Sequence, residues 1–183
     1  MKIVGISGSP RKGNSEFLLR EALDSAKRAG AETELVLLRG MKIGFCDGCL
    51  RCDKTGKCRK KDDMGGIYRK LEESEAILFA SPNYYGNMPG LLKNFIDRMN
   101  PYYFSEKMKG KSVGIIGVGG DPGGGKEVAR IIERGVGDYG LRVVEAAEFV
   151  AGNDPTYSSK DKSTIRKARG LGARIVSSFK QNS

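Results

Sequence analysis

Residues 2–15 read KIVGISGSPRKGNS and join a short apolar run to a glycine-rich turn and a helix start. Residues 2–7 predict a buried strand, because apolar residues dominate them. Residues 15–29 predict a helix that ends at Gly30. Its apolar side carries Phe17, Leu18, Ala22, Leu23 and Ala26. This strand–turn–helix unit favours an α/β domain.

The rest of the chain alternates strand-like and helix-like segments. Further strands are expected over residues 34–38, 76–80, 112–118 and 141–150. Further helices are expected after Asp62 or Asp63, and over residues 90–99, 126–135 and 160–179, with Ile165 and Phe179 facing inward in the last. Five such units favour a doubly wound, flavodoxin-like parallel sheet of order 2-1-3-4-5 with helices on both faces. A chain of 183 residues suits a single domain over residues 1–183.

All four cysteines fall within thirteen residues, with the spacing C-x2-C-x2-C-x5-C: Cys46, Cys49, Cys52 and Cys58. A [4Fe–4S] cluster needs such a set, because each of its irons takes one thiolate. Zinc is the main alternative, although zinc sites usually pair two separate C-x2-C units, which here share Cys49. Disulfides are the second alternative, but no secretory signal is seen, and a reducing cytoplasm favours free thiols. The cysteine loop, residues 42–61, is therefore predicted to bind a [4Fe–4S] cluster.

Charge and composition exclude several classes of function. The chain has no histidine, which excludes a Ser-His-Asp triad, an H-E-x-x-H zinc site and a Rieske centre. The net charge is +10, yet no nucleic-acid-binding motif accompanies it, so a zinc-stabilised nucleic-acid module remains only an alternative. No apolar run reaches about 18 residues, so we expect no membrane span and a cytoplasmic protein.

Basic residues gather among and just after the cysteines, opposed locally by Asp53 alone: Arg51, Lys54, Lys57, Arg59, Lys60 and Lys61. One interpretation is a solvated loop that balances four thiolates. The other is functional, because nearby positive charge raises the potential of a cluster and attracts an acidic electron carrier.

Three further loops follow predicted strands, whose carboxyl ends share one edge of a parallel sheet. Residues 8–15 combine small residues, short polar donors and a helix start, which together form a cradle for a phosphate monoester. The loop resembles a Walker A loop but has Asn14 in place of the lysine. Residues 120–127 also depart from the Walker A motif, because Glu127 replaces the metal-binding Ser or Thr. An NTPase is therefore not expected.

The loop at residues 81–87, SPNYYGN, holds two tyrosines that can stack on an aromatic ligand or cap the core. The glycines near residue 120 either form a flexible loop or let backbone approach a flat ring. For Tyr102, Tyr103 and Phe104 we favour packing or a subunit contact over a substrate pocket.

The segments from Cys46 through residues 62–64, 81–85 and 92–98 resemble the iron–sulfur flavoprotein family. That family is a branch of the flavodoxin-like, NADPH-dependent FMN reductases. The opening Gly8-Ser9-Pro10-Arg11 with Asn14-Ser15 is similar to its FMN-phosphate loop. The resemblance covers nearly the whole chain. The cysteine motif is what distinguishes the iron–sulfur flavoproteins from the other FMN reductases.

The resemblance implies one FMN and one [4Fe–4S] cluster per chain, in a homodimer or homotetramer. FMN phosphate would be bound by Ser9, Arg11, Lys12, Gly13, Asn14 and Ser15. The flavin ring would be bound by Pro82, Asn83, Tyr84, Tyr85, Gly86 and Asn87, together with Gly119 and Gly120. Asn83 departs from the apolar residue expected there.

The implied activity is that of an FMN-dependent oxidoreductase in which the cofactors do the redox chemistry and no side chain is assigned as catalytic. An acidic carrier such as ferredoxin would supply electrons, and oxygen or peroxide could accept them. In order 2-1-3-4-5 the cysteine loop leaves strand two, away from the ring loop, so we expect the cluster to serve the FMN of a neighbouring subunit. The alternative is an NAD(P)H-dependent FMN or quinone reductase whose cysteines bind zinc or nothing.

Overall fold

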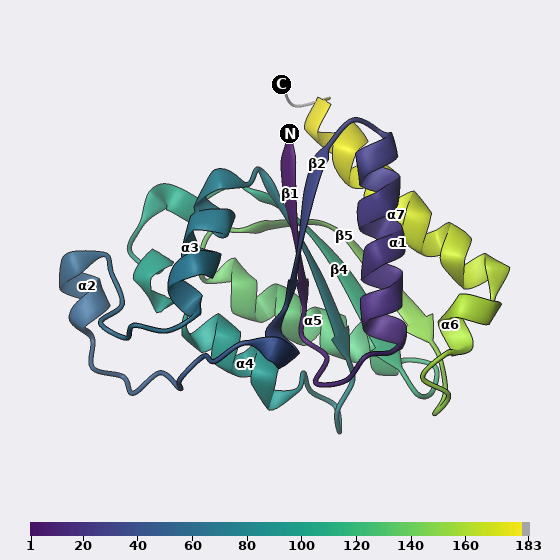
Figure 1. Cartoon of the computed structure of the whole chain (residues 1–183), viewed down its shortest axis with the longest axis horizontal. Coiled ribbons are helices and arrows are strands. Elements are labelled where there is room, and N and C mark those ends of the chain that lie inside the picture. Colours follow the sequence, from purple (N-terminus) through teal and green to yellow (C-terminus); the bar gives the residue numbers. More distant parts are fainter. Residues whose placement is uncertain (181–183) are drawn as a thin grey trace.

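A computed structural model describes residues 1–180 of the chain. Five parallel strands form one sheet of order β2-β1-β3-β4-β5, which confirms the predicted topology (Figure 1). The strands are β1 (Lys2–Ser7), β2 (Glu32–Leu37), β3 (Ala76–Pro82), β4 (Ser112–Gly119) and β5 (Arg142–Val150). The central strands β1, β3 and β4 are almost continuously buried, as expected for a parallel sheet covered on both faces.

Helices cover both faces of the sheet (Figure 1). One face carries α1 (Asn14–Arg28) and α7 (Lys162–Lys180), and the other carries α3 (Met64–Glu73), α4 (Gly90–Asp97) and α5 (Gly124–Gly137). Short helices complete the fold: α2 (Arg51–Thr55), α6 (Tyr157–Lys160), η1 (Leu38–Gly40), η2 (Asn100–Tyr102) and η3 (Glu106–Met108).

Glycine sets the distance between the two helices on the first face. A Cβ atom built on Gly172 of α7 would lie 2.0 Å from the backbone oxygen of Ala22 in α1. Only glycine permits this approach, which brings the buried apolar stripes of both helices onto the sheet. The sequence thus encodes the helix pairing as well as the helices.

Every predicted strand and long helix is present, with ends displaced by no more than two residues. The short helices α2 and α6 were not predicted, because single turns leave no periodic pattern to detect. Three residues expected to face inward, Phe17, Ile165 and Phe179, are only half-buried. Phe17 lies in the first turns of α1, where it packs against the margin of the core and also lines a groove with the segment after β5.

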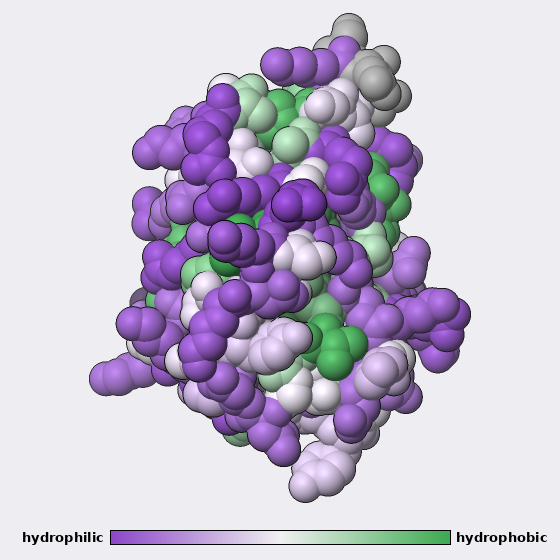
Figure 2. Space-filling view, turned by 90° about the vertical axis from the view of Figure 1, so that its right-hand side faces the viewer, coloured by the Kyte–Doolittle hydropathy of each residue, from purple (hydrophilic) through white to green (hydrophobic). Residues whose placement is uncertain are grey.

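The carboxyl ends of the strands and the loops that follow them share one edge of the sheet (Figure 1). Figure 2 shows the face on the right of Figure 1, where hydrophilic side chains predominate and hydrophobic ones form small separate areas. None of the helices within residues 1–180 combines the length and apolar character that crossing a membrane requires. A ligand site is therefore expected among the loops at the carboxyl edge.

Candidate functional site

The turn between β1 and α1 is fixed to the neighbouring strand. The backbone nitrogen of Gly8 donates to the oxygen of Ala80 in β3 at 2.8 Å. A side chain at Gly8 would meet Leu92 at 2.7 Å, so glycine is required for this close approach. The turn that begins the predicted phosphate cradle is thus built into the sheet.

The start of α1 leaves donors available for an anion. No side chain caps this helix at Gly13, so the backbone N–H groups of its first turn keep the partial positive charge of a helix N-terminus. The Ser7 hydroxyl, buried immediately before the cradle, has no partner among residues 1–180. Uncapped N–H groups at a helix start beside an unpaired hydroxyl fit a phosphate group.

The predicted phosphate-binding side chains have distinct roles in the loop. Ser9 Oγ donates to the backbone oxygen of Arg11 at 2.7 Å, which shapes the turn. Asn14 is buried: its Nδ2 donates to Asp154 O at 2.7 Å, and its Oδ1 accepts from Ser158 N at 2.9 Å. Asn14 therefore holds the segment after β5 against the cradle.

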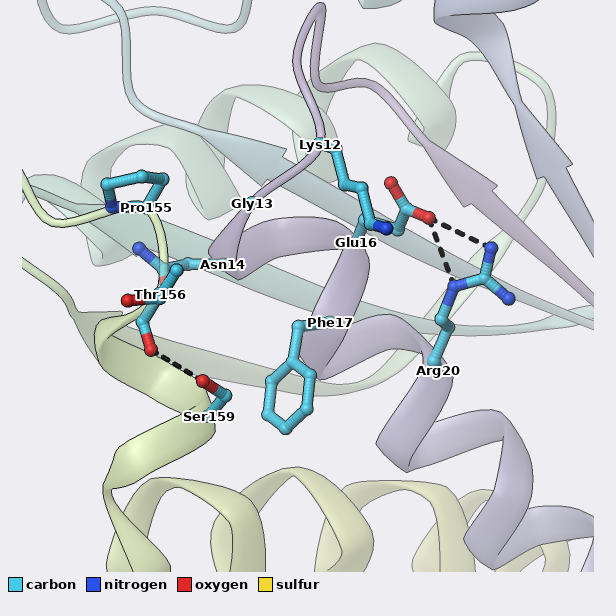
Figure 3. A pocket seen from close by; sticks show the side chains of 9 residues that line it. All are labelled: Lys12, Gly13, Asn14, Glu16, Phe17, Arg20, Pro155, Thr156 and Ser159. Carbon is cyan, nitrogen blue, oxygen red and sulfur yellow. Dashed lines mark hydrogen bonds and ion pairs between the residues drawn. The ribbon is translucent and has the colours of Figure 1, made fainter.

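A groove of about 320 Å³ lies beside the cradle (Figure 3). Its walls combine the start of α1 with the segment after β5, and Figure 3 shows Phe17 between them. Lys12, Gly13 and Asn14 were expected at the site, whereas these lining residues were not: Glu16, Phe17, Arg20, Pro155, Thr156 and Ser159. The position of residues 153–159 just after a fifth parallel strand was the signal that could have identified part of this set.

A second cavity, of about 490 Å³, joins the two loops predicted to hold a ring. It is lined by Asn83, Tyr84, Tyr85, Gly120, Asp121, Gly124, Glu127 and Asn153. Tyr84 is 40% exposed and Tyr85 fully exposed, so neither caps the core. The backbone of Tyr85 has φ 50°, a left-handed conformation that is costly for a bulky residue and is common at ligand sites.

Asn83 holds the tyrosine loop to the glycine-rich loop. Its backbone nitrogen donates to Val118 O at 2.7 Å, and its Nδ2 donates to Gly124 O at 2.6 Å. Its Oδ1 accepts from the backbone nitrogen of Gly86 at 2.8 Å. These contacts explain why a polar residue replaces the expected apolar one, since the amide bonds protein groups on both sides.

The four cysteines are free thiols and line one small cavity of about 20 Å³. Cys46 and Cys49 are exposed, whereas Cys52 and Cys58 are half-buried. Burial raises the pKa of the Cys52 thiol. Within residues 1–180 no three His, Cys, Asp or Glu side chains are arranged closely enough to hold a metal ion. The structure thus brings the predicted ligands to one cavity without closing them into a metal-binding group.

The cysteine loop depends on a few polar contacts at its base. Residues 41–50 lie outside any helix or strand. Asp62 Oδ2 accepts from Gly44 N at 3.0 Å, and Asp63 Oδ2 accepts from Lys42 N at 2.7 Å. Arg98 Nη1 donates to Gly44 O at 2.6 Å. Leu50 has φ 52°, so this region also contains a strained non-glycine residue.

The acidic residue that pairs with the basic residues here is Asp47, whereas Asp53, expected from the sequence to be the one that opposes them, contacts Asn100 and Cys52. Asp47 accepts from Arg59 at 2.5 Å and lies 3.2 Å from the Lys60 ammonium. The four other basic residues have no ion-pair partner among residues 1–180: Arg51, Lys54, Lys57 and Lys61. The loop therefore presents net positive charge to solvent beside the thiols.

The aromatic residues after α4 divide into packed and exposed ones. Tyr102 is buried, and its hydroxyl contacts Tyr68 O at 3.1 Å, which agrees with a packing role. Tyr103 and Phe104 are 52% and 72% exposed and pack edge to face on each other. None of the three lines the ring cavity.

Known proteins are similar to this chain in sequence, and others are similar to it in fold. The family described as NADPH-dependent FMN reductase matches residues 1–156. An iron–sulfur flavoprotein of Archaeoglobus fulgidus is 38% identical over 98% of this chain and 80% of its own length. An iron–sulfur flavoprotein of Methanocaldococcus jannaschii is 36% identical over 96% of both chains. A flavodoxin from the domain Archaea superposes over 98% of this chain and 99% of its own with a TM-score of 0.66 at 17% identity, which shows the flavodoxin-like fold.

Proposed function

The chain belongs to the NADPH-dependent FMN reductase family and to the iron–sulfur flavoproteins within it, and from this we propose that it transfers electrons between a [4Fe–4S] cluster and FMN. It is an FMN-dependent oxidoreductase. The observation that carries the proposal is that the four free cysteines line one cavity. When bound, the cluster would carry single electrons and the flavin two, so the cofactors supply the redox chemistry.

The FMN phosphate would be held in the cradle at residues 8–15. The uncapped start of α1 and the unpaired Ser7 hydroxyl fit a compact dianion. The contacts would come from Ser9, Arg11, Lys12, Gly13, Asn14 and Ser15, with Asn14 acting through its backbone, because its side chain is already bonded. These groups bind and orient FMN at the edge of the sheet.

The flavin ring would lie against the tyrosine and glycine-rich loops. Tyr84 and Tyr85 are exposed and offer stacking surfaces, and Gly120 lets backbone approach closely. Pro82, Asn83, Gly86 and Asn87 shape the tyrosine loop, and Gly119 ends β4 beneath it. Together, residues 8–15, 81–87 and 119–125 are called the flavin loops below.

The cluster would be held by Cys46, Cys49, Cys52 and Cys58. Four thiols on one cavity fit the donor set of a [4Fe–4S] cluster, and the surrounding positive charge offsets the charge of four thiolates. Free thiols also suit a reducing compartment such as the cytoplasm.

The proposed electron donor is an acidic carrier such as ferredoxin, and the acceptor is a small molecule such as oxygen or peroxide. The exposed, unpaired basic residues of the cysteine loop support an acidic donor. We also propose a homodimer or homotetramer in which the cluster serves the FMN of a neighbouring subunit. In support of this, β2 and the ring loop after β3 lie on opposite sides of β1.

A visible spectrum of protein purified without oxygen tests the proposal, with iron, zinc and flavin counted in the same sample. We expect flavin bands over a broad shoulder and about four irons per chain. Flavin with zinc, or with no metal, would contradict the cluster.

The second candidate is an NAD(P)H-dependent FMN or quinone reductase with a structural cysteine loop. It is favoured by one observation, that within residues 1–180 the thiols are not arranged as a metal-binding group. Rapid bleaching of the flavin by NADPH in iron-free protein would support it.

A further inference from the structure

The chain segment that leaves α4 forms a polar wall of the cysteine cavity. The helix ends at Asp97, and Arg98 and Asn100 follow it and line the cavity together with the four cysteines. Their side chains carry N–H donors and no sulfur, so they are not ligands themselves. Two side chains with N–H donors from outside the cysteine loop therefore lie beside four thiols.

Asn100 already contacts one of the thiols. Its Nδ2 lies 3.0 Å from Cys52 Sγ and 3.1 Å from Asp53 Oδ1. An amide N–H directed at sulfur stabilises negative charge on that sulfur. Cys52 therefore receives a hydrogen bond from outside the cysteine loop.

Arg98 brings a buried positive charge to the same wall. Its side chain is 1% exposed, and its guanidinium donates to Asp62 Oδ2 at 2.7 Å and to Gly44 O at 2.6 Å. Its Nε–H, which is also buried, has no partner among residues 1–180. An unpaired buried donor costs about 1–3 kcal/mol, so natural proteins rarely leave one without a reason.

We propose that Arg98 and Asn100 are positioning residues for the cluster, which donate N–H hydrogen bonds to sulfur in the cysteine cavity and raise its reduction potential. The inference rests on the proposed function, because it requires a cluster on the cysteines. Hydrogen bonds to the sulfurs and nearby positive charge both favour the form that carries the additional electron. Arg98 and Asn100 directly follow α4, whose first turn comes just after the tyrosine loop, so one helix connects the two sites.

A matched pair of asparagine variants tests the inference. Asn100→Leu removes the donor to Cys52 with little change in volume. Asn94→Leu removes an equivalent contact, from Asn94 Nδ2 to Ile43 O at 3.0 Å, which holds the base of the same loop without lining the cavity. Each protein is purified without oxygen, its iron and sulfide are counted, and its cluster potential is measured by a dye-mediated titration.

We expect Asn100→Leu to shift the equilibrium between oxidised and reduced cluster about tenfold toward the oxidised form, or about 59 mV for a one-electron couple. Asn94→Leu should leave the potential unchanged. Loss of iron from Asn100→Leu but not from Asn94→Leu would equally support a contact to sulfur. An unchanged potential in Asn100→Leu, or equal shifts in both variants, would overturn the inference and leave the proposed function intact.

Arg98→Lys extends the test to the second donor. Lysine keeps the positive charge but has no Nε–H group, so the potential should fall in the same direction as in Asn100→Leu. An unchanged potential would remove Arg98 from the inference. If Arg98→Lys does not fold, the two asparagine variants decide the question. Wild-type protein without iron would instead refute the proposed function itself.

Discussion

The flavin loops and the cysteine loop leave the same edge of the sheet, but the fold holds them differently. Backbone hydrogen bonds continue the strand pairing into the flavin loops, as from Gly8 N to Ala80 O and from Asn83 N to Val118 O. Over residues 41–50 the cysteine loop has no backbone hydrogen bond to a strand; its backbone bonds include those from Met41 N to Leu38 O and from Asp63 N to Lys42 O. Its base is held by polar side chains, chiefly Asp62, Asp63 and Arg98.

This difference indicates which site is built before its ligand arrives. The sheet determines the positions of the flavin loops, so their cavity exists without FMN. The thiols line a much smaller cavity and are not arranged as a metal-binding group within residues 1–180. We therefore expect the cysteine loop to gain order from its ligand, and changes in one region to leave the other intact.

The largest expected effect is that of Cys52→Ser, which should remove the cluster and leave FMN bound. Removing one of four thiolates should reduce iron from about four per chain to almost none, because each iron needs its own ligand. Flavin content should not change, since the flavin loops are held by the sheet. Metal and flavin analysis of the same sample measures both.

Arg51→Gln is the control, since it changes an exposed neighbour and leaves all four thiols in place. Loss of flavin together with iron in Cys52→Ser would show that the two regions are not independent.

The next largest effect concerns the base of the cysteine loop. Asp62→Asn removes the charge partner of buried Arg98 and should lower the free energy of unfolding by about 3 kcal/mol, the low end for a buried pair, because Asp62 is partly exposed. Asp47→Asn, which breaks exposed ion pairs with Arg59 and Lys60, should cause no measurable change. Urea unfolding compares the stability of the two variants. Equal losses of stability would contradict the larger contribution expected of the buried Arg98–Asp62 pair.

The same ion pair predicts the response of stability to acid. The hydrogen bond from Arg98 lowers the pKa of Asp62. The Arg98–Asp62 ion pair should therefore stabilise the fold fully above about pH 4, the pKa of a free aspartate. This stabilisation should be lost as the pH falls through the lowered pKa of Asp62 in the folded state. Asp62→Asn should lack this part of the acid dependence when unfolding is measured at several pH values.

The contrast between the regions also explains what the sequence could predict. The strand order and the edge that carries the loops follow from the alternation of apolar segments, which many residues encode together. The spacing of the cysteines identified their common cavity, because nearby residues in one loop cannot lie far apart. By contrast, Arg98 and Asn100 lie about 50 residues from Cys52 in sequence, and only the packing of α4 brings them to the cavity.

Phe17 shows a second limit of the sequence. Its helical spacing predicts a core residue, and it does pack against the core, but it is only half-buried and also lines the groove beside the cradle. Helical periodicity identifies the side of a helix but not where along its length the sheet ends. The roles of side chains at the ends of helices could therefore not be predicted from the sequence alone.

A smaller effect is expected from the glycine-rich loop. A Cβ atom at Gly119 would lie 2.7 Å from Gly125 N and 2.8 Å from Asp121 O, so Gly119→Ala must displace backbone that borders the ring cavity. We expect FMN to bind about tenfold more weakly, which is about 1.4 kcal/mol, with iron content unchanged.

Titration of the flavin-free protein with FMN measures the affinity. Gly137→Ala is the control, because a Cβ atom there meets nothing within 4 Å. An unchanged affinity in Gly119→Ala would mean that this turn does not border the bound flavin.

The smallest expected effect is on the rate at which an acidic carrier reduces the protein. Lys54 and Lys57 are exposed on the cysteine loop, so replacing both with glutamine should slow reduction severalfold at low salt. The difference should vanish near 1 M salt, where charges are screened beyond about 3 Å. Glutamine at Lys27 and Arg28, at the far end of α1 (Figure 1), removes the same charge and should have no effect. Equal slowing by both double variants would mean that overall charge, rather than the cysteine loop, attracts the carrier.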